Sequence, residues 1–426
     1  MEFQNSIKNR INAESKTNNS ANYLYNIKSN FILKRIFKNI SQKKKLEINC
    51  YNKITKKRLN ITINDFKEYS QTFTKIEIEI IPYIYEYGKF KNIINKEEVD
   101  YFHIYFNNCE SKIKDYSLPK NHEVKSIKII IDYQVKSFYQ LFKDCYCIKC
   151  INFIKFYRNN INNMGYMFYG CPYLEELNLS NFNTDNVTDM SWMFFKCSSL
   201  KQLNLSIFNT NNVTKMNSMF AGCSSLNELN LSNFDTQKVN DMSFLFNGCS
   251  SIKKLNLSNF NTNNVVNMSY MFSLCSSLES LNVSNFNTIN LTDIRCMFSL
   301  CKSLIKLNLS NFYTKNVKSM CYLFSECSSL QDLNISNFNT NNTTDMGYMF
   351  NGCSLLKELN LSHFNTYNVT NMSFMFNNCS LLERLNIKYF YISNNTDLSN
   401  MFSGCSEKMK KEILIQNENI GEKAFL

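Results

Sequence analysis

Residues 197–222 read CSSLKQLNLSIFNTNNVTKMNSMFAG, and copies of this 26-residue unit fill more than half of the chain. Cysteine marks the period, because it recurs every 26 residues from Cys171 to Cys405, and a weaker copy begins at Cys145. Fixed periods of about 20–50 residues are typical of solenoids, propellers and arrays. The repeat therefore indicates the architecture more directly than any other feature of the sequence.

The centre of each unit alternates apolar and polar residues. Leu203 and Leu205 share one face of an extended segment, and Asn204 and Ser206 share the other. The LxxLxLxxF frame is close to that of a leucine-rich repeat. One unit can neither bury its apolar face nor pair its strand alone, whereas stacked units do both. We predict an α/β repeat solenoid of about ten coils with one parallel sheet, and a short helical or 3₁₀ turn around each Met-Phe pair.

Stacking converts each repeat position into a column, and the cysteine column allows two interpretations. The motif Cys145, Cys147, Cys150, with Cys171 as a fourth ligand, has the thiolates that Zn²⁺ prefers. Free cysteine is also among the most buried residue types, which makes the column a row of small core side chains. We favour packing, and we expect no metal and no cofactor.

The consensus MFxxCSSLxxLNLSNFNTxNVTxM resembles the 26-residue repeat of the BspA-like leucine-rich-repeat surface-protein family, from about Cys145 to Ser406. The resemblance implies a curved solenoid that binds other proteins or cells, and it carries no catalytic residues. Members of that family are usually exported.

Other features of the chain favour an intracellular location. Residues 1–30 contain no apolar core of a signal peptide, and no stretch is long and apolar enough for a membrane span. The 17 cysteines are odd in number, and Asn-x-Ser acceptor sites occur on almost every strand, where stacking leaves no room for a glycan. The BspA-like resemblance leaves a cell-surface location open.

The segments outside the repeat are expected to cap it. We predict a disordered tail over residues 1–28, a helical segment over 29–65, a β-rich capping region over 66–140, the solenoid over 141–406 and a carboxy-terminal cap over 407–426. Strands are expected at Ile76–Ile80, Tyr101–Phe106 and Ile127–Ile131, with a turn at Pro119 and Asn121. In the last segment, Met409, Ile413 and Ile415 suggest one shifted strand.

Residues 31–61 are similar to an F-box, with a short helix ending in Ile-Phe, a turn, a longer helix carrying a Cys, and a basic-Leu close. Ser29 is expected to cap the first helix. The resemblance implies that this helix faces a ubiquitin-ligase adaptor through Ile32, Leu33, Ile36 and Phe37. A plain helical cap would show the same apolar pattern. Residues 1–60 hold 14 Lys/Arg against three Asp/Glu, but the basic clusters lack interleaved aromatic residues, which argues against nucleic acid as a partner.

The outward face of the stacked strands is the candidate binding surface, because one of its columns varies from coil to coil. Uniform columns of Asn and Ser cannot discriminate between ligands, whereas a variable column can. Sequence drift at solvent-exposed positions would produce the same variation. The variable column comprises Glu176, Gln202, Glu228, Lys254, Ser280, Lys306, Asp332, Glu358 and Arg384.

Two further columns are candidate ligand contacts. A second variable column runs through Asp185, Asn211 and Gln237 to Tyr367, and a ladder that includes Thr184, Thr210 and Thr236 would suit an ice- or glycan-binding array. The sequence does not indicate catalysis, because none of the three His is spaced from a nucleophile as in a catalytic motif. We also expect no small-molecule substrate.

The sequence thus predicts a non-enzymatic protein-interaction scaffold with a protein ligand on the strand face. Two alternatives remain: an F-box-like substrate receptor of a ubiquitin ligase, and a cell-surface adhesin.

Overall fold

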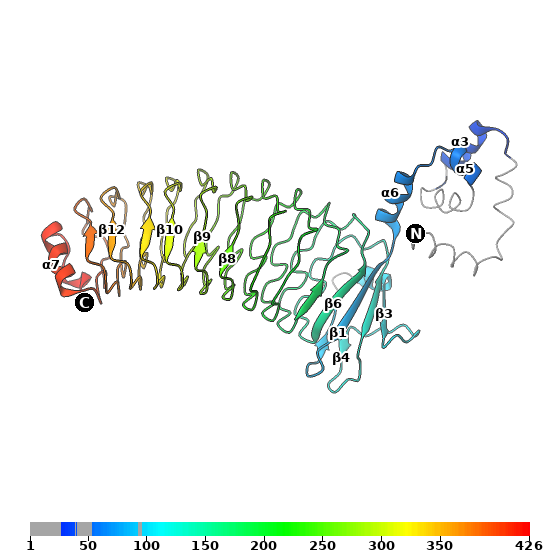
Figure 1. The fold of residues 1–426 in the computed structure, drawn as a ribbon, viewed down its shortest axis with the longest axis horizontal. Helices are drawn as coiled ribbons and strands as arrows, with labels where there is room; N and C mark the ends of the chain where they lie inside the picture. Colours follow the sequence, from blue (N-terminus) through cyan, green and yellow to red (C-terminus); the bar gives the residue numbers. More distant parts are fainter. Residues whose placement is uncertain (1–26, 39, 41–52, 93–95) are drawn as a thin grey trace. The chain divides into compact units, whose positions relative to one another are not determined.

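The computed structural model describes residues 27–38, 40, 53–92 and 96–426 of the chain (Figure 1). It divides into two compact units, Met1–Thr74 and Lys75–Leu426. Residues 1–26 of the expected tail, and most of the longer helix of the F-box-like segment, lie outside the described residues.

The described residues of the first unit form three helices: α3 (Asn30–Lys38), α5 (Lys53–Arg58) and α6 (Ile63–Phe73). Ser29 caps α3 as predicted, because its side chain accepts the Ile32 N–H at 3.4 Å. Arg58 links α5 to the start of α3 by donating to the side chain of Asn30 at 2.7 Å.

Helix α6 was not predicted. Thr62 and Asp65 form a reciprocal capping box at its start, since the Thr62 N–H donates to the Asp65 carboxylate and the Asp65 N–H donates to the Thr62 hydroxyl. The Thr62-x-x-Asp65 spacing is the sequence signal that could have revealed the helix.

The second unit begins with a five-stranded sheet in the order β3-β5-β1-β6-β7. The three strands expected between residues 66 and 140 are confirmed as β1 (Ile76–Pro82), β3 (Phe102–Phe106) and β5 (Ile127–Ile131), and Lys120 and Asn121 form the expected turn. Strands β2 (Gly88–Lys89) and β4 (Ser117–Leu118) form a small antiparallel pair, and a 3₁₀ helix spans Lys96–Tyr101.

Strand β1 closes the open edge of the solenoid. It runs antiparallel to β6 (Ile148–Lys155), whose other edge pairs in parallel with β7 (Glu176–Asn178) in the next coil. An unpaired edge would be a template for aggregation. The capping sheet therefore extends without a break in hydrogen bonding into the first coils, as far as β7.

The coils confirm the predicted parallel stack, but its strands do not form the one sheet that was expected (Figure 1). Strands β7 to β13 are only two or three residues long, and they belong to three separate sheets, one ending at β7, one of β8 to β11, and one of β12 and β13. Equivalent residues pair across coils, so that Leu307 lies opposite Leu333 and Asn308 lies opposite Asn334. The remaining strands of the stack are β8 (Lys254–Leu255), β9 (Ser280–Leu281), β10 (Lys306–Asn308), β11 (Asp332–Asn334), β12 (Glu358–Asn360) and β13 (Arg384–Asn386).

The Met-Phe segment differs from the expected helical turn. Alternate N–H groups bond within the coil, as from Met219 to the Met216 carbonyl, and the others bond to the next coil, as from Phe220 to the Leu245 carbonyl. The alternation requires left-handed residues four apart, such as Ser218 (φ 57°) and Gly222 (φ 77°). This segment is thus a second inter-coil ladder, and it is not a helix.

The core consists of the predicted columns, which run without interruption through the coils. Nine of the ten period cysteines from Cys171 to Cys405 are wholly buried, and Cys405 is 6% exposed. Each of the ten thiols donates to the carbonyl of the Phe 29 residues earlier, at 3.0–3.2 Å. The rings from Phe142 to Phe402 stack coil on coil, with centroids 5.4–5.8 Å apart. The packing interpretation of the cysteine column is confirmed.

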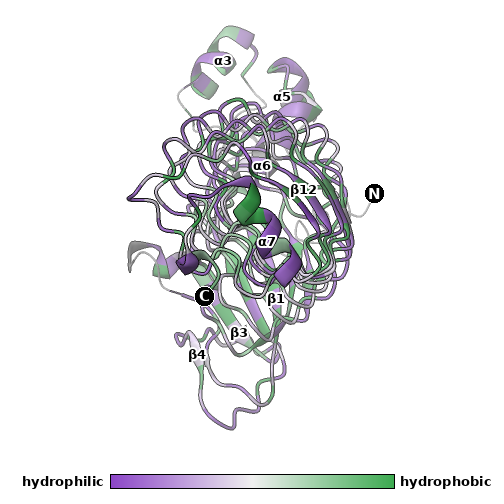
Figure 2. Ribbon diagram, turned by 90° about the vertical axis from the view of Figure 1, so that its left-hand side faces the viewer, coloured by the Kyte–Doolittle hydropathy of each residue, from purple (hydrophilic) through white to green (hydrophobic). Residues whose placement is uncertain are grey.

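The carboxy-terminal cap is a helix, α7 (Glu407–Gln416), where a shifted strand was expected. Ser406 caps its first turn, and Met409 and Ile413, one helical turn apart, are the buried pair, whereas Ile415 is 85% exposed. Figure 2 looks along the stack and shows α7 across its last coil. A short 3₁₀ helix (Glu422–Ala424) follows, and Phe425 stacks on Phe402 to extend the phenylalanine column.

Candidate protein-binding surface

The strand face is built by the alternation within each strand. In the coil of residues 197–222, Leu203 and Leu205 are buried, while Gln202, Asn204 and Ser206 are exposed. The asparagine ends the strand, because its side-chain oxygen accepts the N–H two residues later, as from Ser206 to Asn204 at 3.1 Å. The asparagine column is therefore part of the scaffold, and the variable column beside it is free to differ.

All nine residues of the predicted variable column are exposed on this face. Two neighbouring pairs within the column have opposite charges: Lys306 lies 3.6 Å from Asp332, and Arg384 pairs with Glu358. Such exposed pairs contribute only about 0–1 kcal/mol to stability. Among the described residues, Glu176, Glu228 and Lys254 have no ion-pair partner, so their charges remain available to a ligand.

Three open depressions lie on the strand face. One of about 700 Å³ spans the capping sheet and the first coils, one of about 730 Å³ lies over β8 to β11, and one of about 290 Å³ lies between β12, β13 and α7. Eight of the nine residues of the predicted column line them: Glu176, Gln202, Lys254, Ser280, Lys306, Asp332, Glu358 and Arg384.

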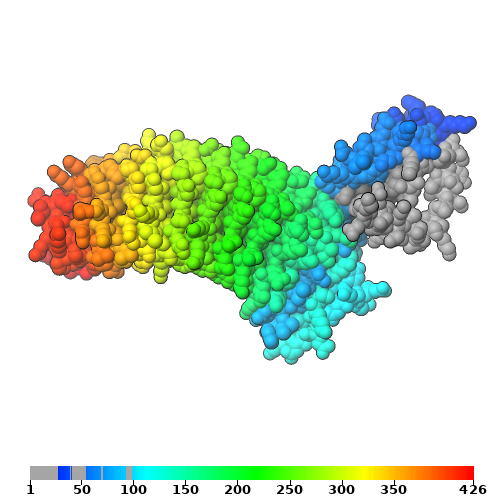
Figure 3. Space-filling model, in the orientation of Figure 1, coloured from blue at the N-terminus to red at the C-terminus, as the bar shows by residue number. Residues whose placement is uncertain are grey.

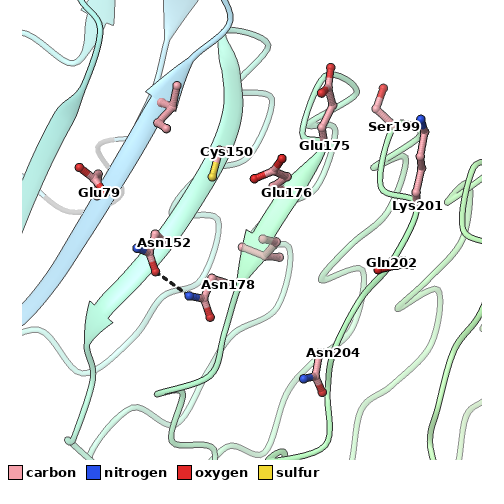
Figure 4. A pocket seen from close by; sticks show the side chains of 12 residues that line it. Glu79, Cys150, Asn152, Glu175, Glu176, Asn178, Ser199, Lys201, Gln202 and Asn204 are labelled. Atoms are coloured by element: carbon pink, nitrogen blue, oxygen red, sulfur yellow. Dashed lines mark hydrogen bonds between the residues drawn. The ribbon is translucent and has the colours of Figure 1, made fainter.

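The first depression also has walls that the sequence did not predict. Glu79 and Ile81 from β1 and Cys150 from β6 lie on the same face as Glu176 (Figure 4). Burial and the carboxylates of Glu176 and Glu79 raise the pKa of Cys150, which is therefore a neutral thiol at neutral pH. The signal in the sequence was the alternation of β1, which continues the outward face of the coils into the capping sheet.

The four cysteines considered as zinc ligands take separate positions. Cys145 and Cys171 donate to backbone carbonyls inside the coils, Cys147 donates to the Lys89 carbonyl at 3.2 Å, and Cys150 lies on the outer face. Within the part of the chain that the structure describes, no group of three His, Cys, Asp or Glu is placed to hold a metal ion.

The threonine ladder is not a ligand array. Thr184, Thr210 and Thr236 are at most 2% exposed. Each hydroxyl donates to the carbonyl of the residue 25 positions later and accepts the N–H of that same residue. The second variable column, from Asp185 to Tyr367, is exposed on the loop that follows the strand.

Helix α3 divides the four residues expected to face an adaptor. Leu33 and Phe37 are buried, at 0% and 4% exposure, whereas Ile32 and Ile36 are exposed, at 52% and 36%. Only two of the four side chains are therefore accessible to a partner, because the helix places the others on its inner side. None of the described helices is long and apolar enough to cross a membrane.

These features define the class of the protein, a leucine-rich-repeat-like solenoid with capped ends and an exposed strand face. The chain belongs to the family described as "Mycoplasma protein of unknown function, DUF285", whose model matches residues 136–230, 223–330 and 301–414. The three matches together cover the coils. With the coil stack, they confirm the BspA-like repeat recognised in the sequence.

Solved structures of other leucine-rich-repeat proteins are similar to this chain only at a distance. A leucine-rich repeat protein from Bacteroides ovatus is 18% identical over 70% of this chain and 87% of its own, with a TM-score of 0.28. A leucine rich cell surface protein from Faecalibacterium prausnitzii is 15% identical over 63% and 85%, also with a TM-score of 0.28. The TLR13–ssRNA13 complex matches at 15% identity over 58% and 41%, with a TM-score of 0.23. The search of curated proteins finds no match.

Proposed function

We propose that this chain is a non-enzymatic scaffold that binds a protein ligand on its strand face, through the variable column. The observation that carries the proposal is the contrast between columns. The core, threonine and asparagine columns repeat nearly unchanged. The threonines bond to the next coil and the asparagines bond to the backbone of their own coil, while the exposed column beside them changes in size and charge from coil to coil. Nothing in the arrangement of the residues that the structure describes indicates an enzymatic activity.

The dimensions of the face support a protein ligand. Nine coils at a strand spacing of about 4.8 Å place the column along roughly 40 Å, which suits a standard protein–protein interface. Figure 3 shows the coils as successive bands along one side of the second unit. The Met-Phe ladder runs through all the coils, and strand pairing adds to it within each sheet, so the face is organised before a ligand arrives.

Charge reversal on the strand face tests this proposal. A triple variant with Lys254→Glu, Lys306→Glu and Arg384→Glu changes three exposed cations of the column. A matched control reverses three exposed lysines outside the variable column, with Lys196→Glu, Lys302→Glu and Lys318→Glu. We expect the first variant to lose at least tenfold in affinity for a partner captured with the unmodified chain, and the control to lose less than twofold. Equal affinities for all three proteins would reject the strand face.

A second candidate function is the F-box-like receptor, which Ile32 and Ile36 favour because both are exposed on one face of α3. The double variant Ile32→Asp with Ile36→Asp would abolish capture of a ubiquitin-ligase adaptor by the full chain. Capture that is absent, or that persists in the variant, removes this candidate. Detection by antibody on intact cells would instead support the adhesin.

A further inference from the structure

The loop between β1 and β2 displays large hydrophobic and aromatic side chains that remain mostly exposed to solvent. It reads YIYEY over residues 83–87, and Ile84, Tyr85 and Tyr87 are 70%, 79% and 56% exposed. Ile81 before the loop and Tyr146 beside it are a further 43% and 49% exposed. The backbone places Tyr146 next to the loop, because the Tyr83 N–H donates to the carbonyl of Cys147 at 2.7 Å.

The base of this loop is held in place. The Glu86 N–H donates to the Tyr83 carbonyl at 3.2 Å, and the Cys147 thiol donates to the carbonyls of Gly88 and Lys89 at 3.4 and 3.2 Å. The ring of Tyr83 stacks on Tyr173 with centroids 5.1 Å apart, which joins the loop to the first complete coil. The exposed side chains therefore stand on an organised turn.

Turn formation does not explain these residues. Ile84 and Tyr85 occupy the two central positions of the Tyr83–Glu86 turn, where Pro, Asn, Asp and Gly are the residues that favour a turn. Large apolar side chains at these positions leave apolar surface in contact with water, which is unfavourable, and little of that surface is buried in the fold. Tyrosine is also enriched at the buried centres of protein interfaces, because it supplies a large rigid surface with one polar end.

The loop is continuous with the first depression of the strand face. Ile81 lines that depression, and Tyr173 precedes Glu175, another lining residue, by two positions. Carboxylates predominate around it: Glu79, Glu175 and Glu176 line it and Glu86 lies in the loop, against Lys201 in the lining and Lys149, which is 3.7 Å from Glu175. Among the described residues, Glu79 and Glu176 have no ion-pair partner, which leaves negative charge unneutralised beside the aromatic loop.

We propose that the Tyr83–Tyr87 loop and the adjoining depression dock an extended, basic peptide segment of a partner protein. Its aromatic or aliphatic side chains contact Ile84 and Tyr85, and its Lys or Arg side chains pair with Glu79 and Glu176. This inference rests on the proposed strand-face function, and it assigns the amino-terminal end of that face a partner of defined chemistry.

The test uses a random 12-residue peptide library displayed on phage and selected against the full chain. The most enriched sequence is then synthesised with a fluorophore, and its dissociation constant is measured by fluorescence anisotropy. The loop variant carries Ile84→Ser and Tyr85→Ser, and the charge variant carries Glu176→Lys. Matched controls are Tyr389→Ser, an exposed tyrosine (65%) far along the solenoid, and Glu383→Lys, an exposed carboxylate near its end. Circular dichroism confirms that each variant is folded.

We expect enriched sequences that combine Lys or Arg with apolar residues. Their dissociation constant should rise at least tenfold in the loop and charge variants, rise with added salt, and change less than twofold in the controls. Acidic consensus sequences, no enrichment, or equal affinity in the loop variant would overturn the inference. Binding that is lost only on reversal of Lys254, Lys306 and Arg384 would overturn it too, but would leave the proposed strand-face function standing.

Discussion

Thr236 shows how a single side chain connects two coils. Its hydroxyl donates to the Asn261 carbonyl at 2.8 Å and accepts the Asn261 N–H at 2.8 Å, with no exposure to solvent. The hydroxyl therefore satisfies two backbone groups that would otherwise be buried without partners. The same geometry recurs along the column, so each threonine joins its coil to the next.

Replacing Thr236 by valine should lower the free energy of unfolding by about 1–3 kcal/mol, because both backbone groups of Asn261 lose their partner while the side-chain volume is kept. Chemical denaturation monitored by circular dichroism measures the change. Thr236→Ser, which keeps the hydroxyl, is the control and should lose distinctly less. A valine variant as stable as the unmodified chain would mean that the ladder is dispensable.

The cysteines divide into buried and exposed thiols with different ionisation. Burial raises the pKa of Cys223 and of Cys275 to about 12, whereas hydrogen bonds from Ser111 lower the pKa of the exposed Cys109. The thiolate is the reactive form of cysteine. Cys50 is replaced by serine so that it cannot react with the reagent. In this variant, a thiol reagent at neutral pH should modify Cys109 rapidly and the period cysteines only after unfolding.

The pH dependence of labelling follows from the same shifts. The rate at Cys109 should reach half of its maximum at a lower pH than for an ordinary cysteine, because its thiolate forms earlier. Denaturant should release a burst of modification from the period cysteines, and peptide mapping by mass spectrometry assigns each site. Labelling of Cys223 in the folded chain at a rate similar to Cys109 would contradict the buried column.

Helix α7 ends the solenoid by making the hydrogen bonds to β13 that one further strand would make. The Gln416 side chain donates to the Leu385 carbonyl at 2.9 Å and accepts the Ile387 N–H at 3.1 Å, which are the bonds that another coil would make to β13. The side chain of Asn417 likewise donates to the Phe390 carbonyl at 2.8 Å. The cap thus satisfies the last edge with side chains instead of backbone.

Gln416→Ala should therefore expose the β13 edge. Hydrogen exchange at the Ile387 amide should accelerate at least tenfold, and the free energy of unfolding should fall by roughly 1–3 kcal/mol, because two edge bonds are lost. Light scattering after size exclusion should detect association through the open edge. Ile415→Ala, at an 85% exposed position of the same helix, is the control and should leave exchange at Ile387 unchanged.

At the scale of the second unit, each coil contacts its neighbours through the two ladders and the shared core columns, so stability is expected to be a sum over coils and their interfaces. Deleting residues 250–275 joins Cys249 to Ser276 and preserves every column. This variant should fold, with a modestly lower melting temperature and the period cysteines still protected.

Deleting half a unit, residues 250–262, tests the same principle in the opposite direction. The columns after the deletion no longer continue those before it, and the polar strand face meets the apolar core. We expect loss of cooperative unfolding and rapid modification of the cysteines. If both deletions behave alike in circular dichroism and thiol labelling, the period does not control the stack.

Much of the fold could be predicted because each contact between coils recurs at the same position of every repeat. The parallel strands and the Cys and Phe columns needed only period and alternation. The helix at Glu407–Gln416 was missed because Met409, Ile413 and Ile415 fit either period in so short a segment, and only packing against the last coil selects Met409 and Ile413. The inward position of Thr236 could not be predicted because sequence spacing does not show which side of a turn faces inward.

The sequence by itself determined that the units stack in register and which residues fill their core. A repeat position wrongly assigned to the core would place an unsuitable residue in every coil. Only the tertiary structure decided how the ends close, that the outward face extends into β1 with Glu79 and Ile81, and that Ile84 and Tyr85 stand exposed beside it. Those features depend on contacts between segments that occur once in the chain, for which periodicity carries no information.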